Sequence, residues 1–250
     1  MGRIIDLSVP LTKRSQHLNT YDIKHINHKE LMKKRAPELG LSEKDFPDWG
    51  HCASDNVSLI THDGSHLDAP WHFAPTSEGK PAKTIDQVPL SWCYGNGVLL
   101  DFHHFERERP IETDDLKAAI EKISYQLEPY DIVLVRTDAT KHWLEEGYKK
   151  VGAGVTADAT VWLLDQGIKC TGIDSWTWDQ PFDVMLKREK LQETFLESHK
   201  LGHKREYVHM ESLANLDKIP KPFGFKVAAF PINLEGASAG WIRPVAIIED

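Results

Sequence analysis

The sequence contains no run of 18 or more apolar residues, and this absence excludes a membrane-spanning helix. It also lacks a basic excess, because 30 lysines and arginines face 38 aspartates and glutamates, giving a formal net charge of −8. Without a basic stripe to neutralise phosphates, we expect no nucleic-acid partner. The opening residues 1–6 lack the apolar core of a signal peptide. We therefore expect a chain that neither enters a membrane nor binds nucleic acid.

Cysteine is scarce, and Cys52, Cys93 and Cys170 are odd in number and widely spaced. This usage excludes a disulfide framework and suits a reducing compartment, which predicts a cytoplasmic location. We expect all three cysteines to be buried free thiols, because unpaired cysteine behaves as a small apolar residue.

Several motifs of other enzyme classes are also missing. The sequence has no Gly-x-Ser-x-Gly, which disfavours a serine hydrolase, and no Gly-x-Gly-x-x-Gly or P-loop, which disfavours a nucleotide cofactor. What is present is ordinary for a globular protein: 250 residues, 40% hydrophobic and 27% charged. A chain of this length can bury a substantial core.

The pattern of apolar residues indicates an α/β chain. Apolar or β-prone runs between turn or charge signals predict strands at 57–61, 97–102, 131–136, 226–230 and 244–248. Thr113 is expected to cap a helix that continues to Ile123, and Thr156 to cap one that Gly167 ends. Strands interleaved with a few helices predict a mixed β/β/α domain around a central mixed sheet.

Four potential metal ligands fall within eleven residues: His62, His66, Asp68 and His72. Imidazole nitrogen and carboxylate oxygen suit zinc and its first-row neighbours. All four positions are even, so in an extended chain their side chains would project to one side. An extended step from His62 to His66 would span about 13 Å, too far to share one ion. We therefore expect the chain to turn at 63–64, an Asp-Gly pair.

His62, His66 and Asp68 are the predicted metal ligands. Two imidazoles and one carboxylate leave an open position for water, as a catalytic site requires, whereas a closed structural site would normally use a fourth protein ligand. A metal in such a site lowers the pKa of its coordinated water towards neutrality and so provides hydroxide at physiological pH.

The motif resembles His-x-Gly-Thr-His-x-Asp-x-Pro-x-His, the signature of the cyclase-like metal hydrolases, which include kynurenine formamidases and isatin hydrolases. Ser65 stands where the family usually has threonine, and the swap keeps the hydroxyl. Further blocks that look like the family lie at 5–8, 133–137, 172–174, 211–216 and 237–246. The resemblance implies one domain over 1–250 of the swivelling β/β/α type. It also implies one or two divalent ions, zinc or manganese, and a homodimer or homotetramer.

The resemblance makes His72 the general base and acid, since imidazole can take a proton from water and return it to a leaving amine. From spacing alone, a core histidine bonded to a carbonyl is the alternative. Family members that bind a second metal supply a His and a Glu twelve residues apart, which matches His199 and Glu211. His203 and His209 lie in the same stretch and are alternatives to His199. With one ion only, His199 and Glu211 would line the pocket.

Aromatic residues near these blocks offer apolar walls for a flat, aromatic small-molecule substrate. The candidates are Trp49, Trp71, Phe73, Trp176 and Trp178. Most tryptophans pack in cores, so we expect one or two at the site. Ser175, Thr177 and Asp179 follow the 172–174 block, where loop residues can orient either the substrate or an imidazole. Trp49 falls within residues 17–50, a charged, His-rich segment that is either a solvated insertion or a cover over the active-site mouth.

Together these features predict a metal-dependent amidohydrolase that cleaves a formamide or cyclic amide C–N bond. By resemblance the expected substrate is N-formylkynurenine, giving kynurenine and formate in tryptophan catabolism, with isatin or a lactone as the alternative. A metal-dependent cyclase or lyase is a second class, which incorporation of water into the product would distinguish. A non-catalytic metal binder is a third, and His72 disfavours it, because binding alone needs no proton shuttle.

Overall fold

The computed structural model describes residues 2–15 and 22–249. The chain divides into two compact units, one formed by Met1–His17 with Thr61–Asp250 and the other by Leu18–Ile60. The smaller unit contains most of the segment 17–50 that the sequence set apart, and it continues as far as Ile60.

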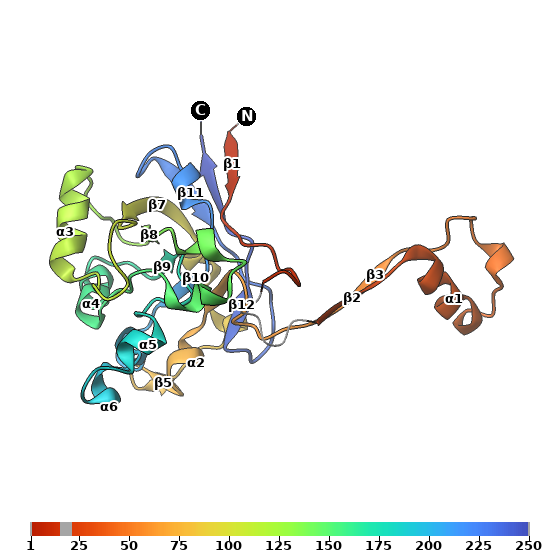
Figure 1. Ribbon diagram of the computed structural model, residues 1–250, viewed down its shortest axis with the longest axis horizontal. Coiled ribbons are helices and arrows are strands. Elements are labelled where there is room, and N and C mark those ends of the chain that lie inside the picture. Colours follow the sequence, from red (N-terminus) through yellow and green to blue (C-terminus); the bar gives the residue numbers. More distant parts are fainter. Residues whose placement is uncertain (1, 16–21, 250) are drawn as a thin grey trace. The chain divides into compact units, whose positions relative to one another are not determined.

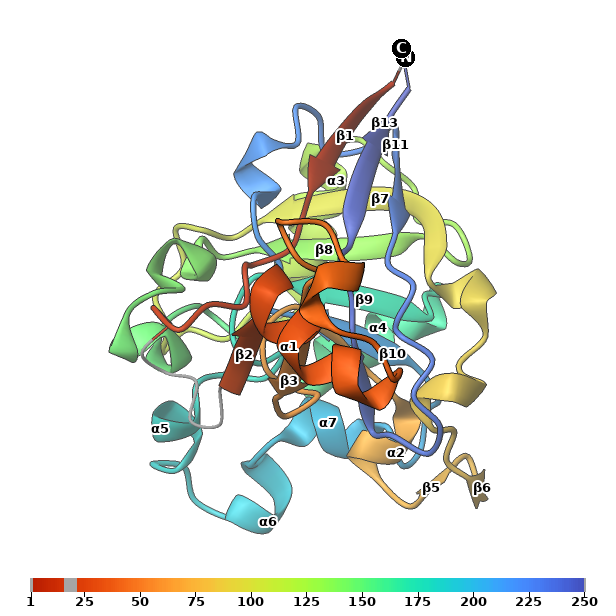
Figure 2. The same cartoon turned by 90° about the vertical axis from the view of Figure 1, so that its right-hand side faces the viewer.

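The larger unit is built on a nine-stranded mixed sheet of order β1-β13-β11-β7-β8-β9-β10-β4-β12 (Figure 1). Strands β7 to β10 run parallel to one another and lie side by side across the unit, and the outer strands pair antiparallel (Figure 2). The strands are β1 (Arg3–Asp6), β4 (His66–Asp68), β7 (Tyr94–Asp101), β8 (Ile132–Arg136), β9 (Cys170–Ile173), β10 (Val208–Glu211), β11 (Phe225–Ala228), β12 (Ala239–Trp241) and β13 (Val245–Ile248). The predicted mixed α/β fold is confirmed.

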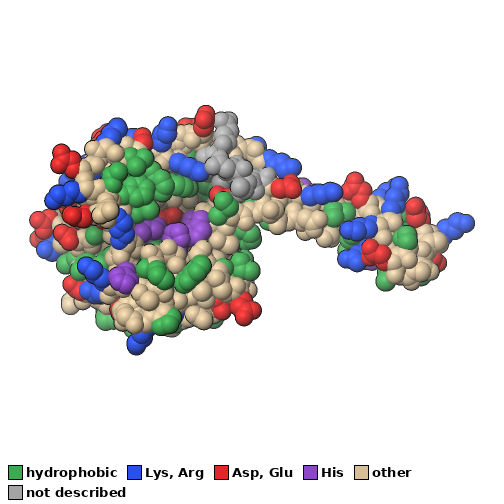
Figure 3. Space-filling model, turned by 90° about the horizontal axis from the view of Figure 1, so that it is seen from below, with side chains coloured by type: hydrophobic (Ala, Val, Ile, Leu, Met, Phe, Trp, Pro, Cys, Tyr) green, Lys and Arg blue, Asp and Glu red, His purple; other side chains and the backbone are tan. Residues whose placement is uncertain are grey.

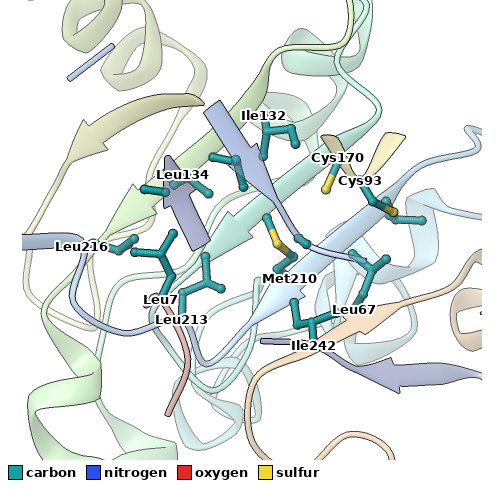
Figure 4. Packing of buried hydrophobic residues seen from close by; sticks show 14 of the residues in the cluster. Leu7, Leu67, Cys93, Ile132, Leu134, Cys170, Met210, Leu213, Leu216 and Ile242 are labelled. Atoms are coloured by element: carbon teal, nitrogen blue, oxygen red, sulfur yellow. The ribbon is translucent and has the colours of Figure 1, made fainter. Parts of the chain in front are cut away.

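The central strands of the sheet are buried on both faces, which explains the continuously apolar sequence of β8. Ile132 and Leu134 belong to one core cluster, which Figure 4 shows packed with residues such as Met210. Val133 and Val135 point to the opposite face and belong to a second cluster. Because side chains alternate along a strand, a strand covered on both sides needs apolar residues at every position.

Two helices cover the second face: α3 (Thr113–Lys122) and α4 (Ala157–Asp165). Thr156 caps α4 by accepting a hydrogen bond from the Ala159 N–H, as predicted, and Gly167 follows the helix with a φ of 88°. The cap predicted for α3 was wrong by one position. Glu112 is the cap residue, and its N–H donates to the Asp115 carboxylate at 2.9 Å.

Short elements complete the larger unit, and α2 and α7 among them carry residues of the candidate site. The helices are α2 (Pro70–Phe73), α5 (Phe182–Met185), α6 (Leu191–Thr194) and α7 (Glu197–Leu201). Strands β5 (Thr76–Ser77) and β6 (Lys80–Pro81) form a small hairpin. Single 3-10 turns lie at Ile85–Gln87, Leu90–Trp92, Ala139–His142, Glu146–Lys150 and Leu216–Lys218.

The smaller unit pairs β2 (Asp22–Ile26) with β3 (Ser54–Ser58) and places α1 (His28–Glu38) and the 3-10 turn Glu43–Asp45 between them. Asn27 caps α1, and its side chain accepts from the N–H groups of the first turn. The strand predicted at 57–61 lies earlier in the chain, at β3.

Two further predictions concern the burial of the cysteines and the absence of a membrane-spanning helix. Cys93 and Cys170 are buried free thiols as predicted, but Cys52 is exposed, because it belongs to the smaller unit, where buried side chains are few. The longest described helix, α1, has 11 residues, so no helix in the described ranges reaches the roughly 20 residues needed to cross a bilayer.

Candidate metal centre

The turn predicted within the histidine motif is present at Gly64, whose φ is 77°. A Cβ atom at this position would lie 2.5 Å from the Leu11 side chain, so glycine suits both the backbone and the packing. The turn brings the rings of His62 and His66 to a centroid distance of 5.2 Å. The chain therefore folds back between the two histidines, as the spacing required.

Ser65 fixes the motif to the rest of the fold. Its hydroxyl accepts a hydrogen bond from the Val9 N–H at 2.9 Å and donates to the Ser212 carbonyl at 2.7 Å. Both partners come from segments distant in sequence, next to β1 and β10. Both hydrogen bonds are made by the hydroxyl group, which serine and threonine share, so serine can replace threonine at this buried position.

Strand pairing brings the second group of candidate ligands to the motif. In the antiparallel register of β10 and β4, Glu211 lies opposite His66 and His209 lies opposite Asp68. His199 arrives from α7, with its Nε2 3.8 Å from Asp68 Oδ2 and 3.6 Å from Glu211 Oε1. Side chains more than 130 residues apart thus meet around one carboxylate.

Two overlapping sets of potential ligand atoms result, each with all its atoms within 4.8 Å of one another. One set is His62, Asp68 and His72, and the other is Asp68, His199, His209 and Glu211. His66 lies beside both, with its Nε2 3.3 Å from Asp68 Oδ1 and 3.6 Å from Glu211 Oε2. Asp68 is shared, and its side chain is fully buried.

The donor atoms fit a divalent cation. His66 Nε2 is buried and makes no hydrogen bond within residues 2–15 and 22–249, and Asp68 Oδ1 faces His62 Nδ1 at 2.8 Å and His66 Nε2 at 3.3 Å. Buried polar atoms are nearly always satisfied, so an unsatisfied nitrogen in such a cluster indicates a missing partner. Imidazole nitrogens with carboxylate oxygens suit a first-row metal ion. The larger unit therefore contains a centre able to hold a divalent metal.

Outer hydrogen bonds orient three of the histidines. His66 Nδ1 donates to the Gly64 carbonyl at 2.8 Å, and His199 Nδ1 donates to the Asp179 carboxylate at 2.6 Å. Since both partners only accept, each ring must carry its proton on Nδ1 and present Nε2 to the centre. His62 Nε2 lies 2.9 Å from the Ser238 hydroxyl, leaving Nδ1 facing Asp68. Asp179 thus orients an imidazole, one of the two roles that its position predicted, whereas Ser238 lies in the family-like block 237–246 but had no predicted role.

Replacing Asp179 with asparagine should weaken metal binding roughly 10- to 100-fold, because a neutral acceptor holds the His199 imidazole less firmly and makes it a poorer ligand. Chelator competition on the purified variant measures the affinity. Asp165→Asn, which alters a surface ion pair with Arg205, is the control and should leave the affinity unchanged. Equal affinities for all three proteins would refute the orienting role of Asp179.

Charge and burial set opposite protonation states within the cluster. Burial opposes protonation of His66 and His209, but the carboxylates of Asp68 and Glu211 outweigh it and raise the pKa of His66 to about 8 and that of His209 to about 9. Burial would raise the pKa of Asp68, but His66 and His72 hold it well below its usual value. Burial lowers the pKa of His72 to about 4, so this ring is neutral at pH 7.

Metal affinity should rise with pH up to about 8 and level off above it. The metal-free chain keeps a proton on His66 below its raised pKa of about 8, and a metal ion must displace that proton. One displaced proton changes the apparent affinity about tenfold per pH unit. Chelator competition across this range, with proton release recorded in weak buffer, measures the effect. A flat affinity without proton release would contradict it.

The site is open to solvent on one side. The side chains of His62 and His72 are 24% and 32% exposed, whereas that of His66 is 1% exposed. Figure 3 shows histidine side chains gathered in a hollow of the larger unit, with hydrophobic side chains on either side. A small molecule can therefore approach the His62 and His72 edge of the cluster.

The remaining predicted residues lie in different surroundings. Trp71, next to His72 on α2, is 48% exposed. Phe73 stacks on Tyr207 at 5.1 Å and meets the His199 ring edge-on at 5.5 Å, so it supports the cluster. Trp176 packs on another aromatic ring, that of Phe182, at 4.9 Å.

Three other candidates lie outside the cluster or in the core. His203 is away from both ligand sets and contacts Thr76. Trp178 is fully buried and donates its backbone N–H to Glu211 Oε1 at 2.8 Å, so it is a core residue and not a pocket wall. Trp49 belongs to the smaller unit, where it is 63% exposed, and its contact with substrate stays a prediction.

The sequence is similar to that of known proteins. A family model described as "Putative cyclase" matches residues 5–180. A kynurenine formamidase of Bacillus cereus is 27% identical over 195 residues, 77% of this chain and 80% of that protein. An isatin hydrolase of Roseibium aggregatum is 26% identical over 207 residues, 76% of this chain and 73% of that protein.

The fold is shared as well. A crystal structure of an isatin hydrolase bound to the product analogue thioisatinate superposes with a TM-score of 0.78 at 21% identity. The superposition covers 100% of this chain and 93% of the other. Because the family model matches well over half of the sequence, the chain belongs to the cyclase family.

Proposed function

We propose that the chain is a metal-dependent hydrolase that cleaves the C–N bond of a formamide, with N-formylkynurenine as substrate and kynurenine and formate as products. One observation carries the proposal. The neutral imidazole of His72 lies at the exposed edge of the ligand cluster, with its Nε2 3.8 Å from Asp68 Oδ2. A proton acceptor beside a metal centre is the arrangement that hydrolysis of an amide needs. The relatives named kynurenine formamidase support the substrate.

His62, His66 and Asp68 would hold the ion, either zinc or manganese. His199 and Glu211 would complete its coordination or hold a second ion. When bound, the metal supplies Lewis-acid polarisation of the amide carbonyl and of the attacking water. The remaining chemistry, which is proton transfer and orientation of the substrate, belongs to the side chains of the protein.

His72 would move the proton. It is neutral at pH 7, so its Nε2 can accept a proton from the attacking water as the water oxygen bonds to the carbonyl carbon. Its low pKa then makes the protonated ring a ready donor to the nitrogen that leaves as the C–N bond breaks. The proton removed from water ends on the amine, and the oxygen ends in formate. The exposed Trp71 beside it would provide an apolar wall for the aromatic ring of the substrate.

Turnover in ¹⁸O-labelled water tests the reaction class and the substrate together. Metal-loaded protein given N-formylkynurenine should form kynurenine and formate that carries one ¹⁸O atom. Isatin is assayed in parallel, and metal-free protein is the control. Faster hydrolysis of isatin would support the proposed reaction but show that isatin, and not N-formylkynurenine, is the better substrate. A product without label would show that the enzyme is a lyase or cyclase and not a hydrolase.

A further inference from the structure

His209 is the buried histidine of the cluster whose surroundings differ most from those of a metal ligand. It lies on β10 directly opposite Asp68 and is fully buried. Its Nε2 is 3.0 Å from Asp68 Oδ2 and 3.2 Å from Glu211 Oε1. By distance alone it qualifies as a ligand.

The hydrogen bonding of the other ring nitrogen, Nδ1, distinguishes His209 from the neighbouring histidines. A histidine that binds a metal through Nε2 carries its proton on Nδ1, and it normally donates that proton to a carbonyl or carboxylate. His66 and His199 both do so. His209 Nδ1 is buried and has no hydrogen-bond partner among the described residues. Ligation through Nε2 would therefore leave a buried N–H without an acceptor, which folded proteins avoid.

Aromatic rings hold His209 in this orientation. The Trp178 ring stacks on it at 5.9 Å with an interplanar angle of 22°, and Phe73 and Tyr207 approach at 4.9 Å and 5.7 Å. These rings offer Nδ1 no hydrogen-bond acceptor, whereas Nε2 faces the two carboxylates and carries a proton whether the ring is neutral or charged. The ring cannot turn without displacing this packing.

We propose that His209 is a positioning residue and not a metal ligand: its Nε2–H donates to Asp68 Oδ2 and Glu211 Oε1 and fixes both carboxylates. The inference rests on the metal centre of the proposed function. Glu211 Oε1 also accepts the Trp178 N–H, so each carboxylate keeps its other oxygen, Asp68 Oδ1 and Glu211 Oε2, for an ion. Both of those oxygens lie on the His66 side.

Cobalt binding to substitution variants tests the assignment without a substrate. In His209→Gln the side-chain amide can still donate a hydrogen bond but is a poor metal ligand, whereas His209→Phe keeps the ring and removes the donor. His66→Gln, which removes a proposed ligand, is the reference for the affinity and the Co²⁺ spectrum of a protein that has lost a ligand. Affinity is measured by chelator competition, coordination by the visible spectrum of bound Co²⁺, and folding by thermal unfolding.

We expect His209→Gln to bind Co²⁺ within about threefold of the wild type and with its spectrum, and His209→Phe to bind roughly 10- to 100-fold more weakly. If His209→Gln loses affinity and shifts its spectrum as His66→Gln does, His209 is a ligand and the inference is wrong. This comparison stands even if the phenylalanine variant does not fold. A wild-type chain that takes up no Co²⁺ would overturn the proposed function, and the inference with it.

Discussion

Replacing His72 with alanine should lower kcat for N-formylkynurenine by roughly 10²- to 10⁴-fold while the metal content stays unchanged. The imidazole is neutral at pH 7 and sits 3.8 Å from Asp68 at the solvent edge of the cluster. Its proposed role is proton transfer and not ligation, so metal binding should survive its removal. Steady-state kinetics and metal analysis of the same preparation measure both properties.

His142→Ala is a matched control for the His72 variant, because His142 is a surface histidine paired with Glu145. It should keep full turnover. A His72→Ala protein that turns over the substrate at the wild-type rate would refute the role of His72 as the proton shuttle. One that loses its metal as well would make His72 a ligand.

Asp68→Asn should abolish stable metal binding and reduce turnover to the level of the metal-free protein. Asp68 belongs to both sets of potential ligands, and its carboxylate oxygens face histidines from β4, β10, α2 and α7. Asparagine keeps the shape and removes the charge. The loss should exceed the roughly 10- to 100-fold effect expected for an outer partner such as Asp179.

Metal titration followed by chelator competition measures this loss for Asp68→Asn. Asp183→Asn, which alters a partly exposed ion pair with Arg107, is the control and should bind metal normally. Unaltered metal affinity in Asp68→Asn would show that the ion, if one binds, lies elsewhere.

The local features of the site could be predicted from the sequence because their causes are local. Even spacing from His62 to His72 required a turn, and an Asp-Gly pair supplied it at Gly64. The continuous apolar run of β8 follows from burial on both faces. The pair His199 and Glu211 was indicated by the resemblance to family members with a His and a Glu twelve residues apart, and the structure brings both to Asp68.

Other features depend on contacts between distant segments and could not be predicted. The sequence offered His209 only as an alternative to His199, whereas both join the cluster, because β10 pairs with β4 across 141 residues and sets His209 opposite Asp68. Ser238 reaches His62 across 176 residues. Phe73 is adjacent to His72 in sequence, but it packs on Tyr207 and His199. Residue type alone does not indicate these packing partners, and contact of Phe73 with substrate stays a prediction.

Turnover as a function of bound metal is the measurement that tests the central claim most directly. Protein stripped by a chelator is titrated separately with Zn²⁺ and Mn²⁺, and hydrolysis of N-formylkynurenine is followed against ions bound per chain. We expect no turnover without metal and activity that rises in proportion to occupancy, levelling off when the cluster around Asp68 is filled. Full turnover by the metal-free protein would contradict a metal-dependent hydrolase at this site.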